Sequence, residues 1–395
     1  MINFDFQKNC TGCGACYNIC PVSAVSMVED DEGFLIPKVN IEKCISCGMC
    51  DKICPHLNHE NLKLSSSEMK WGGVWLYSSK DTEAKLKSSS GAACYELGRA
   101  VIKKGGIISG CAWDGNLVAV HIIGSDEETL KRMQGSKYVQ SNTGNIYSEI
   151  EKHLKKGKFV LFTGTPCQAT AAHNYIMGQD NGKYREKLLT VAVICHGVAS
   201  PLVWESYKKW DAERVGSPLV NVNFRDKSKE GYKKSYCKFE YLSGAVIYHP
   251  TYLPSSKYME ATIVYNLAMR NCCTHCECKG VNKGIDLIVG DWYAANTGEG
   301  QLGTSCIVAF TDRGRKFAEE NLVGLREFSY EKILKDNSFI ETSITESKNR
   351  ALFFKKIRDY HFWDRVENLY PPKYKFKTLL IRLKLYDLIK KIIVR

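Results

Sequence analysis

Short apolar runs alternate with amphipathic segments through the middle of the chain, from Trp71 to about Cys306. Runs rich in Val, Ile, Leu and Phe predict β-strands, because such side chains fit a half-buried pleated surface. The predicted strands are residues 73–77, 106–110, 159–162 and 189–195. Apolar positions at helical spacing predict helices over residues 93–103 and 145–155. This alternation of strand and helix is typical of an α/β core.

The segments around the core differ in pattern. Residues 215–260 are rich in Val, Tyr and Phe with polar alternation, which predicts an antiparallel insert. Residues 311–370 are charged and helical in pattern, and Pro371-Pro372 separates them from a basic tail. The predicted divisions are a cysteine-rich module (1–56), a polar linker (57–70), the core (71–310), a helical region (311–372) and the tail (373–395).

The 18 cysteines of this 395-residue chain are unevenly placed, with eight in residues 1–54 and ten in the remainder. Clustered cysteines in this arrangement indicate metal ligands rather than a disulfide scaffold. The N-terminus has no basic and apolar signal segment, and no apolar run reaches the roughly 18 residues of a membrane span. We therefore expect a cytoplasmic protein with reduced thiols.

The net charge of +12 comes mainly from the tail, because residues 373–395 hold eight basic residues and one acidic residue. Five of these bases share one face of a predicted helix, with apolar residues on another: Lys373, Lys377, Lys384, Lys391 and Arg395. Such a helix can lie peripherally on the anionic inner face of a membrane, or it can dock on its own core with its charges solvated. Because the rest of the chain is nearly balanced in charge, we expect no nucleic-acid partner.

One cysteine motif occurs twice near the N-terminus. The pattern Cys-x2-Cys-x2-Cys-x3-Cys-Pro begins at Cys10 and again at Cys44. Three close cysteines can hold one iron–sulfur cubane, while the fourth, before proline, reaches another cluster. Gly12, Gly14 and Gly48 let the backbone bend around such a cluster. Structural zinc is the alternative, although zinc normally takes two Cys-x2-Cys knuckles.

The repeated motif resembles that of bacterial two-cluster ferredoxins. The resemblance implies two 4Fe-4S clusters, one held by Cys10, Cys13, Cys16 and Cys54 and the other by Cys20, Cys44, Cys47 and Cys50. The predicted fold is an α+β ferredoxin-like N-terminal module, followed by an α/β core domain with an antiparallel insert and a helical C-terminal region.

Further short motifs follow one another in the core. They are KSSSG at 87–91, GSKYVQS at 135–141, TGTPCQ at 163–168, CHGVASP at 195–201, FRDK at 224–227, Arg270-x2-Cys273-x2-Cys276 and DLIVGDW at 286–292. In this order they resemble the coenzyme F420 hydrogenase/dehydrogenase beta-subunit family, whose members include enzymes of surface-polysaccharide loci. The resemblance implies FAD and a further 4Fe-4S cluster, with electrons passing from iron–sulfur to flavin and on to an organic acceptor.

Several of these motifs suit a flavin nucleotide. Thr163, Gly164 and Thr165 follow an apolar run, where backbone amides can approach a phosphate or a ring. Residues 88–91 precede a predicted helix, whose N-terminus attracts a pyrophosphate, and Lys137 adds positive charge. The candidate flavin-binding residues are Ser89, Ser90, Gly91, Ser136, Lys137, Tyr138, Gln140, Ser141, Thr163, Gly164, Thr165 and Gln168. Ordinary glycine and serine turns are the alternative.

Four cysteines on the core motifs are candidate ligands of the third cluster: Cys167, Cys195, Cys273 and Cys276. The first two follow predicted strands, where the loops of an α/β sheet converge. Cys272 and Cys278 flank the second pair, and either could replace one ligand. In a competing interpretation Cys167 is a nucleophile with His196 as its base. The remaining cysteines are expected to be small buried side chains: Cys94, Cys111, Cys237 and Cys306.

His196, Arg225 and Lys227 are the candidate catalytic residues at the acceptor site. A histidine can donate a proton near neutral pH, and Arg or Lys can hold a phosphate or carboxylate. A histidine bonded to a backbone carbonyl and a solvated charged turn are the alternatives. Asp286 and Asp291 are expected to fix the loop after a strand.

Two functions follow from these features. The first is an iron–sulfur flavin-dependent oxidoreductase, and the second is a non-catalytic electron-transfer subunit that delivers electrons to a partner enzyme. Ala92 and Tyr232 stand where the family commonly has glycine and tryptophan. The acceptor therefore stays open between coenzyme F420, a sugar intermediate of surface-polysaccharide biosynthesis and another conjugated molecule, and the basic tail favours the sugar. The expected redox partner is a ferredoxin or a hydrogenase/dehydrogenase subunit.

Overall fold

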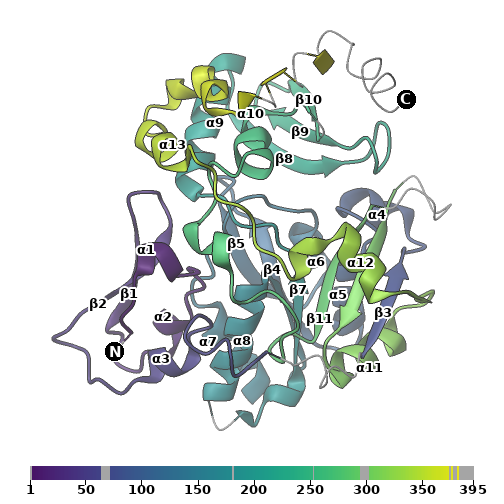
Figure 1. Cartoon of the computed structure of the whole chain (residues 1–395). Coiled ribbons are helices and arrows are strands. Elements are labelled where there is room, and N and C mark those ends of the chain that lie inside the picture. Colours follow the sequence, from purple (N-terminus) through teal and green to yellow (C-terminus); the bar gives the residue numbers. More distant parts are fainter. Residues whose placement is uncertain are drawn as a thin grey trace.

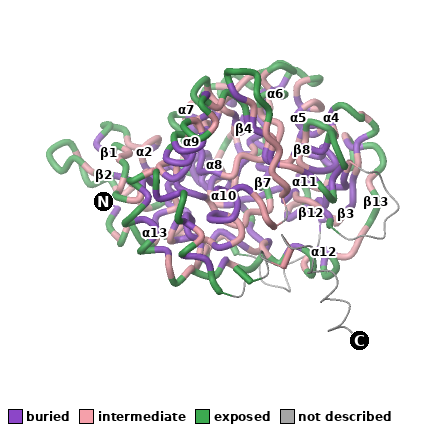
Figure 2. The backbone as a smooth tube through the Cα atoms, turned by 90° about the horizontal axis from the view of Figure 1, so that it is seen from above, coloured by how far each residue is buried: buried purple, intermediate pink, exposed green. Residues whose placement is uncertain are grey.

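The computed structural model describes residues 2–63, 72–179, 182–251, 253–293, 302–372, 375–376 and 380–381. Three parts lie side by side in Figure 1: a small N-terminal module, a central sheet covered by helices, and a smaller sheet packed with the C-terminal helices. Figure 2 shows that the most deeply buried segments run through the central sheet and the helices packed on it. This arrangement confirms the predicted fold class.

The N-terminal module repeats its structure as it repeats its sequence. Its elements are α1 (Phe6–Asn9), α2 (Ala15–Ile19), β1 (Val25–Glu29), β2 (Leu35–Val39) and α3 (Met49–Ile53). Strands β1 and β2 form an antiparallel pair. Helices α2 and α3 both begin after a glycine in the left-handed conformation, Gly14 with φ of 74° and Gly48 with φ of 69°. Only glycine adopts this turn without a steric penalty, so each cysteine motif needs glycine there.

The central sheet has eight strands among the described residues, in the order β13-β3-β12-β11-β7-β6-β4-β5. Their bounds are β3 (Gly73–Tyr77), β4 (Ile107–Trp113), β5 (Ala119–Gly124), β6 (Val160–Gly164), β7 (Leu188–Val193), β11 (Leu287–Trp292), β12 (Thr304–Ala309) and β13 (Arg326–Glu327). Strands β4, β6, β7 and β11 are parallel, and the other pairings are antiparallel. The carboxyl ends of the parallel strands therefore meet at one edge, where ligands bind in open α/β sheets.

Helices cover both faces of this sheet. On one face are α7 (Ile146–Lys155), α8 (Pro166–Gly178) and α12 (Tyr330–Asp336), which share a core with the N-terminal module. On the other face are α4 (Thr82–Lys87), α5 (Ala93–Lys103), α6 (Glu127–Met133) and α11 (Asp312–Asn321). Ile19 and Ile53 of the N-terminal module are buried in the first of these cores, which fixes the module against α7 and α8.

The antiparallel insert and the C-terminal helices form a third, aromatic core. The three-stranded sheet consists of β8 (Leu219–Asp226), β9 (Tyr236–Tyr241) and β10 (Val246–Pro250). It packs with α9 (Pro201–Val215), α10 (Lys257–Met259), α13 (Arg350–Lys356) and a 3-10 segment over Tyr360–Leu369. Trp204, Tyr207 and Trp363 are almost fully buried there. Phe34 of the β1–β2 turn joins the same core, so both neighbouring parts hold the N-terminal module in place.

The predicted elements agree closely with those observed, and the differences concern their ends. Strand β6 continues through Gly164, so Thr163 and Gly164 lie in the sheet rather than in a loop. Strand β7 ends at Val193, which leaves Cys195 in the loop that follows. Asp286 directly precedes β11 and accepts from Thr311 and Arg313, in the segment that follows β12, whereas Asp291 lies inside β11, so the expectation that it fixes a loop after a strand was wrong.

The C-terminal tail falls largely outside the described residues, so the predicted basic helix over 373–395 stays a prediction. Within the part of the chain that is described, no helix has the length and apolar character needed to cross a membrane.

Candidate metal centre

The first N-terminal cysteine set, Cys10, Cys13, Cys16 and Cys54, is buried. Burial raises the pKa of Cys54 to about 12, and the nearby thiol of Cys13 adds to this shift. Burial also raises the pKa of Cys16, with contributions from Cys13, Cys10 and Cys54. The four thiols thus influence one another in a space closed to water, as expected of residues that share one group.

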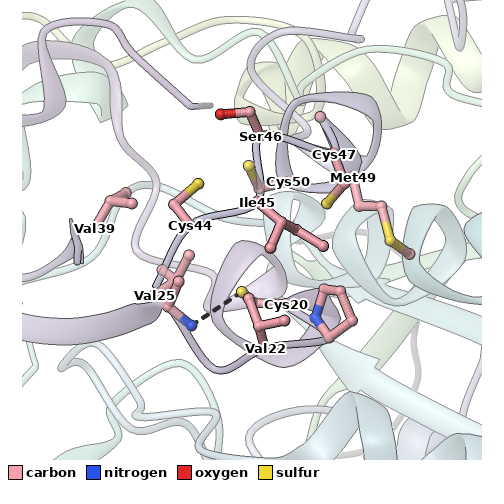
Figure 3. A pocket seen from close by; sticks show the side chains of 13 residues that line it. Cys20, Val22, Val25, Val39, Cys44, Ile45, Ser46, Cys47, Met49 and Cys50 are labelled. Carbon is pink, nitrogen blue, oxygen red and sulfur yellow. Dashed lines mark hydrogen bonds between the residues drawn. The ribbon is translucent and has the colours of Figure 1, made fainter. Parts of the chain in front are cut away.

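The second set, Cys20, Cys44, Cys47 and Cys50, lines a cavity at the outer side of the N-terminal module (Figure 3). The Ala24 amide donates a hydrogen bond to Cys20 Sγ over 3.1 Å, the kind of contact that tunes a bound cluster. Cys47 is exposed, and Ile45 beside it is 61% exposed. The first set is therefore buried and the second is nearer the surface, while Cys20 and Cys50 of the second set pack against the small core that contains Cys16 and Cys54.

The third set comes from three distant segments of the chain. Cys167 lies in the first turn of α8 after β6, Cys195 follows β7, and Cys273 and Cys276 lie at a 3-10 turn over Asn271–His275. All four line one cavity. Because β6 and β7 are adjacent parallel strands, their following loops meet at this edge of the sheet.

The two flanking cysteines differ in position. Cys272 lines the cavity together with the four candidates, whereas the buried Cys278 is not among its lining residues. A hydrogen bond from Cys278 lowers the pKa of Cys276 to about 7 in spite of burial, and a bond from Cys272 lowers the pKa of Cys273. Thiolate is the form that binds metal, and one member of each neighbouring pair, Cys272/Cys273 and Cys276/Cys278, is stabilised as thiolate by the other.

The competing nucleophile interpretation requires a hydrogen bond between Cys167 and His196. Both residues line the cavity, but Cys167 Sγ lies 3.1 Å from Thr165 Oγ1, and His196 Nε2 lies 2.7 Å from Asn266 Oδ1. No hydrogen bond joins Cys167 to His196 among the described residues. Nor do those residues contain a group of three or more His, Cys, Asp or Glu side chains arranged to hold a single metal ion.

The third set adjoins the first N-terminal set. Thr11, between Cys10 and Cys13 in sequence, lines the cavity of the third set. Tyr147 Oη and Thr143 Oγ1 each donate to the Cys13 carbonyl over 2.9 Å. The thiols of Cys13 and Cys167 also lie close enough for Cys13 to contribute to the raised pKa of Cys167, in which burial is the largest cause.

The predicted flavin residues fall into two groups. In the first, Ser89 Oγ and Ser136 Oγ lie 2.8 Å apart, so the loops that carry Ser89–Gly91 and Ser136–Tyr138 are in contact. A Cβ at Gly91 would lie 2.4 Å from the Tyr77 carbonyl oxygen, so only glycine fits there. Lys137 Nζ donates to three carbonyls at the end of α6, and burial lowers its pKa to about 8. The first group therefore lies at the N-terminus of α5.

The second group serves the fold and its contact with the N-terminal module. Gln168 Nε2 donates to Ser141 Oγ over 3.0 Å, and Gln168 Oε1 accepts from the Thr165 amide over 3.0 Å. Gln140 Nε2 donates to the Thr11 carbonyl over 2.9 Å, and Thr163 Oγ1 donates to the Ser109 carbonyl over 3.0 Å. The structure thus separates these residues from the loops around Ser89 and Ser136.

The predicted catalytic residues are also divided. Burial lowers the pKa of His196, which lies at the cysteine cavity. Lys227, in contrast, is 2% exposed and donates through Nζ to the carbonyls of Ser90 over 2.9 Å and Leu302 over 2.6 Å. Burial lowers the pKa of Lys227 to about 7. Lys227 therefore belongs with the first group of flavin candidates and not with His196.

Arg225 stands in a cluster that the sequence motifs did not indicate. Its Nη2 lies 2.9 Å from Asp291 Oδ2, and its guanidinium lies over the rings of Tyr232, at 5.3 Å, and Tyr293, at 5.9 Å. Arg225 Nε and Tyr232 Oη are buried without a hydrogen-bond partner among the described residues. Two buried donors without acceptors fit a bound anionic or carbonyl-bearing molecule. The sequence indicated Arg225, Asp291 and Tyr232 separately, and Tyr293 directly follows the DLIVGDW motif, but nothing in the sequence indicated that the four residues meet.

The structure also bears on Ala92, which departs from the family pattern, and on the four cysteines that were expected to be buried. Ala92 has φ of 67°, a left-handed conformation that glycine adopts more easily, which accounts for the glycine common in the family at this position. Cys237 and Cys306 are buried as expected, while Cys94 and Cys111 are partly exposed.

Two regions of the chain match known protein families. Residues 9–58 match the family model described as 4Fe-4S dicluster domain, and residues 157–325 match the model for the C terminus of the coenzyme F420 hydrogenase/dehydrogenase beta subunit. No curated protein matches the chain. Among solved structures, the chain is similar to a chain of the F420-reducing NiFe hydrogenase complex from Methanosarcina barkeri, with 18% identity, coverage of 76% of this chain and 91% of that chain, and a TM-score of 0.45.

The chain therefore combines a 4Fe-4S dicluster domain with a region similar to the C-terminal domain of F420 hydrogenase/dehydrogenase beta subunits. The dicluster match decides between iron–sulfur and zinc for the N-terminal cysteines, and it makes the chain an iron–sulfur electron-transfer protein.

Proposed function

We propose that this chain is an iron–sulfur flavoprotein oxidoreductase that transfers electrons between a redox partner and an organic acceptor. The observation that carries the proposal is the convergence of Cys167, Cys195, Cys273 and Cys276 on one cavity next to the first N-terminal cysteine set. When bound, 4Fe-4S clusters carry one electron at a time, and FAD can collect two electrons and transfer them as a hydride.

The proposed cluster ligands are three sets of four cysteines. The first is Cys10, Cys13, Cys16 and Cys54, the second is Cys20, Cys44, Cys47 and Cys50, and the third is Cys167, Cys195, Cys273 and Cys276. The surface position of the second set suits contact with an external redox protein, such as a ferredoxin or a hydrogenase/dehydrogenase subunit. The buried first set lies between it and the core, which supports a route inward.

The proposed flavin site is the first group of candidates, at the N-terminus of α5. Ser89, Ser90 and Ser136 offer hydroxyls and amides, and Gly91 allows close approach of backbone. The N-terminal amides of α5 favour a pyrophosphate. Lys227 adds a buried amine against the Ser90 carbonyl, positioned to hold the loop and to place positive charge near the group.

The unpartnered donors of Arg225 and Tyr232 support an acceptor that carries a phosphate, carboxylate or carbonyl oxygen. Coenzyme F420 and an oxidised sugar intermediate of surface-polysaccharide biosynthesis both satisfy this chemistry, so both enter the test. His196 does not belong to this group of residues around Arg225, because it lines the cavity of the third cysteine set.

Anaerobic purification and chemical reduction test the proposal. The protein should contain about twelve irons and one FAD per chain, since three cubanes hold four irons each. The reduced protein should be reoxidised by one of the small acceptors, which would show its own catalytic activity. Reoxidation only by a partner protein would instead establish the alternative, an electron-transfer subunit without a substrate. An iron content near eight per chain would contradict the core cluster. The absence of flavin absorbance would overturn both the enzyme function and the electron-transfer-subunit function.

A further inference from the structure

Arg270 occupies the contact between the N-terminal module and the third cysteine set. It lines the core cavity, yet its guanidinium reaches into the first N-terminal loop. Nε donates to the Cys10 carbonyl over 2.6 Å, Nη2 to the Leu35 carbonyl over 3.0 Å, and Nη1 to Gln140 Oε1 over 2.8 Å. The side chain also lies over the Phe34 ring, 5.0 Å from its centre. Arg270 is therefore fixed from several sides.

The fit of the guanidinium depends on Gly12. A Cβ at this position would lie 2.5 Å from Arg270 Nη1, a distance at which one of the two would have to move. Gly12 also has φ of 66°, so the bend of the cysteine loop and the space for the guanidinium rest on the same residue. The first cysteine motif is thus shaped to receive Arg270.

Among the described residues, the charge of Arg270 has no carboxylate within ion-pair distance. Its hydrogen bonds all go to neutral oxygens, and no ion pair among the described residues includes it. The side chain is only 2% exposed, and burying a charge without a counter-charge is costly. Burial opposes the charged form of Arg270, but negative charge at Cys10, Cys272, Cys273 and Asp30 more than offsets it, so the pKa of Arg270 is raised. The negative groups that surround Arg270 are therefore cysteines of the N-terminal loop and of the core turn, together with the more distant Asp30 carboxylate.

We propose that Arg270 is a positioning residue that raises the reduction potentials of the clusters on either side of it, one in the N-terminal module and one in the core. It therefore favours the reduced state of these two clusters. This inference rests on the proposed cluster assignments. A cubane held by four thiolates is anionic, and one-electron reduction adds a further negative charge. A fixed buried cation stabilises the reduced form more than the oxidised form, since net charge and hydrogen bonding set cluster potentials.

The test is a redox titration of the anaerobically purified full chain, followed by electron paramagnetic resonance. Arg270→Gln removes the charge, Arg270→Lys keeps it, and Gln140→Glu compensates it without removing the arginine. The matched control is Arg350→Gln, since Arg350 is 5% exposed, pairs with Glu32 of the N-terminal module and donates to the Met269 carbonyl over 2.8 Å. The control loosens the same contact between module and core without removing a charge next to cysteines.

We expect Arg270→Gln and Gln140→Glu to move at least one midpoint to a more negative potential. Arg270→Lys should stay near wild type, and the cluster on Cys20, Cys44, Cys47 and Cys50 should not move. Unchanged midpoints in both charge-altering variants would overturn the proposal, as would an equal shift in Arg350→Gln. If Arg270→Gln does not retain its iron, Gln140→Glu decides. An iron content near eight in the wild type would contradict the proposed core cluster, while the effect of Arg270 would still be measured on the N-terminal clusters.

Discussion

Asp286 holds together the elements beneath the candidate site, and its replacement by asparagine should destabilise the core strongly. The carboxylate is fully buried. Its Oδ2 accepts from the Thr190 amide at 2.8 Å and from Arg185 Nη2 at 3.1 Å. Its Oδ1 accepts from Thr311 Oγ1 at 2.7 Å and from Arg313 Nη2 at 2.8 Å. All of these neighbours are donors, so an amide group at either position would face a donor.

The magnitude follows from the two arginines. Breaking a buried ion pair by removing one partner costs about 3–5 kcal/mol. Arg185 is 8% exposed, whereas Arg313 is 20% exposed and also pairs with Glu186 at 3.3 Å, so part of the loss is recovered by solvent. We expect about 3 kcal/mol for Asp286→Asn. With a urea dependence of about 3 kcal/mol per molar, the unfolding midpoint should fall by about 1 M.

The assay is anaerobic urea unfolding followed by circular dichroism, with Asp312→Asn as the control. Asp312 also pairs with an arginine, Arg315 at 3.5 Å, but its side chain is 93% exposed, so its replacement should leave the midpoint unchanged. Equal midpoints for Asp286→Asn and Asp312→Asn would refute this reasoning.

The effect of Asp286 should also depend on pH. Burial opposes ionisation of Asp286, but Arg185 and Arg313 more than offset it, so its pKa in the folded protein is lowered. A lowered carboxylate pKa contributes stability above the unfolded value of about 3.9 and loses it as the pH falls through the folded pKa. The difference between wild type and Asp286→Asn should therefore be complete at pH 7 and shrink below about pH 4.

Three further predictions concern the cofactor sites. Cys195→Ala should reduce iron from about twelve to about eight per chain, whereas the buried Cys237→Ala should retain all of it, as measured by iron and sulfide analysis; equal iron in both variants would argue against Cys195 as a ligand. Because burial lowers the pKa of Lys227 to about 7, its positive charge is lost as the pH rises through that value, so the Kd for FAD should rise above pH 7 in the wild type and stay flat in Lys227→Met; parallel pH profiles would contradict this role. Truncation to residues 1–372 should abolish co-sedimentation with anionic vesicles, and equal binding of the two forms would exclude the tail as the membrane contact.

Local patterns in the sequence were enough to predict several elements of the central domain and to find the two cysteine motifs of the N-terminal module. The helix over Ala93–Lys103 and the strand over Gly73–Tyr77 have the predicted bounds, because apolar periodicity and turn residues act over a few positions. The paired Cys-x2-Cys-x2-Cys-x3-Cys-Pro motifs likewise carry their meaning in short spacings. These features need no knowledge of which distant segments meet.

Which distant segments of the chain come together could be known only from the order of strands in the central sheet. Cys167 and Cys195 adjoin because β6 pairs with β7, and Lys227 of the insert reaches Ser90 across more than one hundred positions of sequence. Arg270 was visible as part of a motif, but its place between two cysteine sets follows only from the docking of the N-terminal module on α7 and α8. Strand order and domain docking are fixed by long-range burial of whole faces, which leaves no periodic signal along the chain.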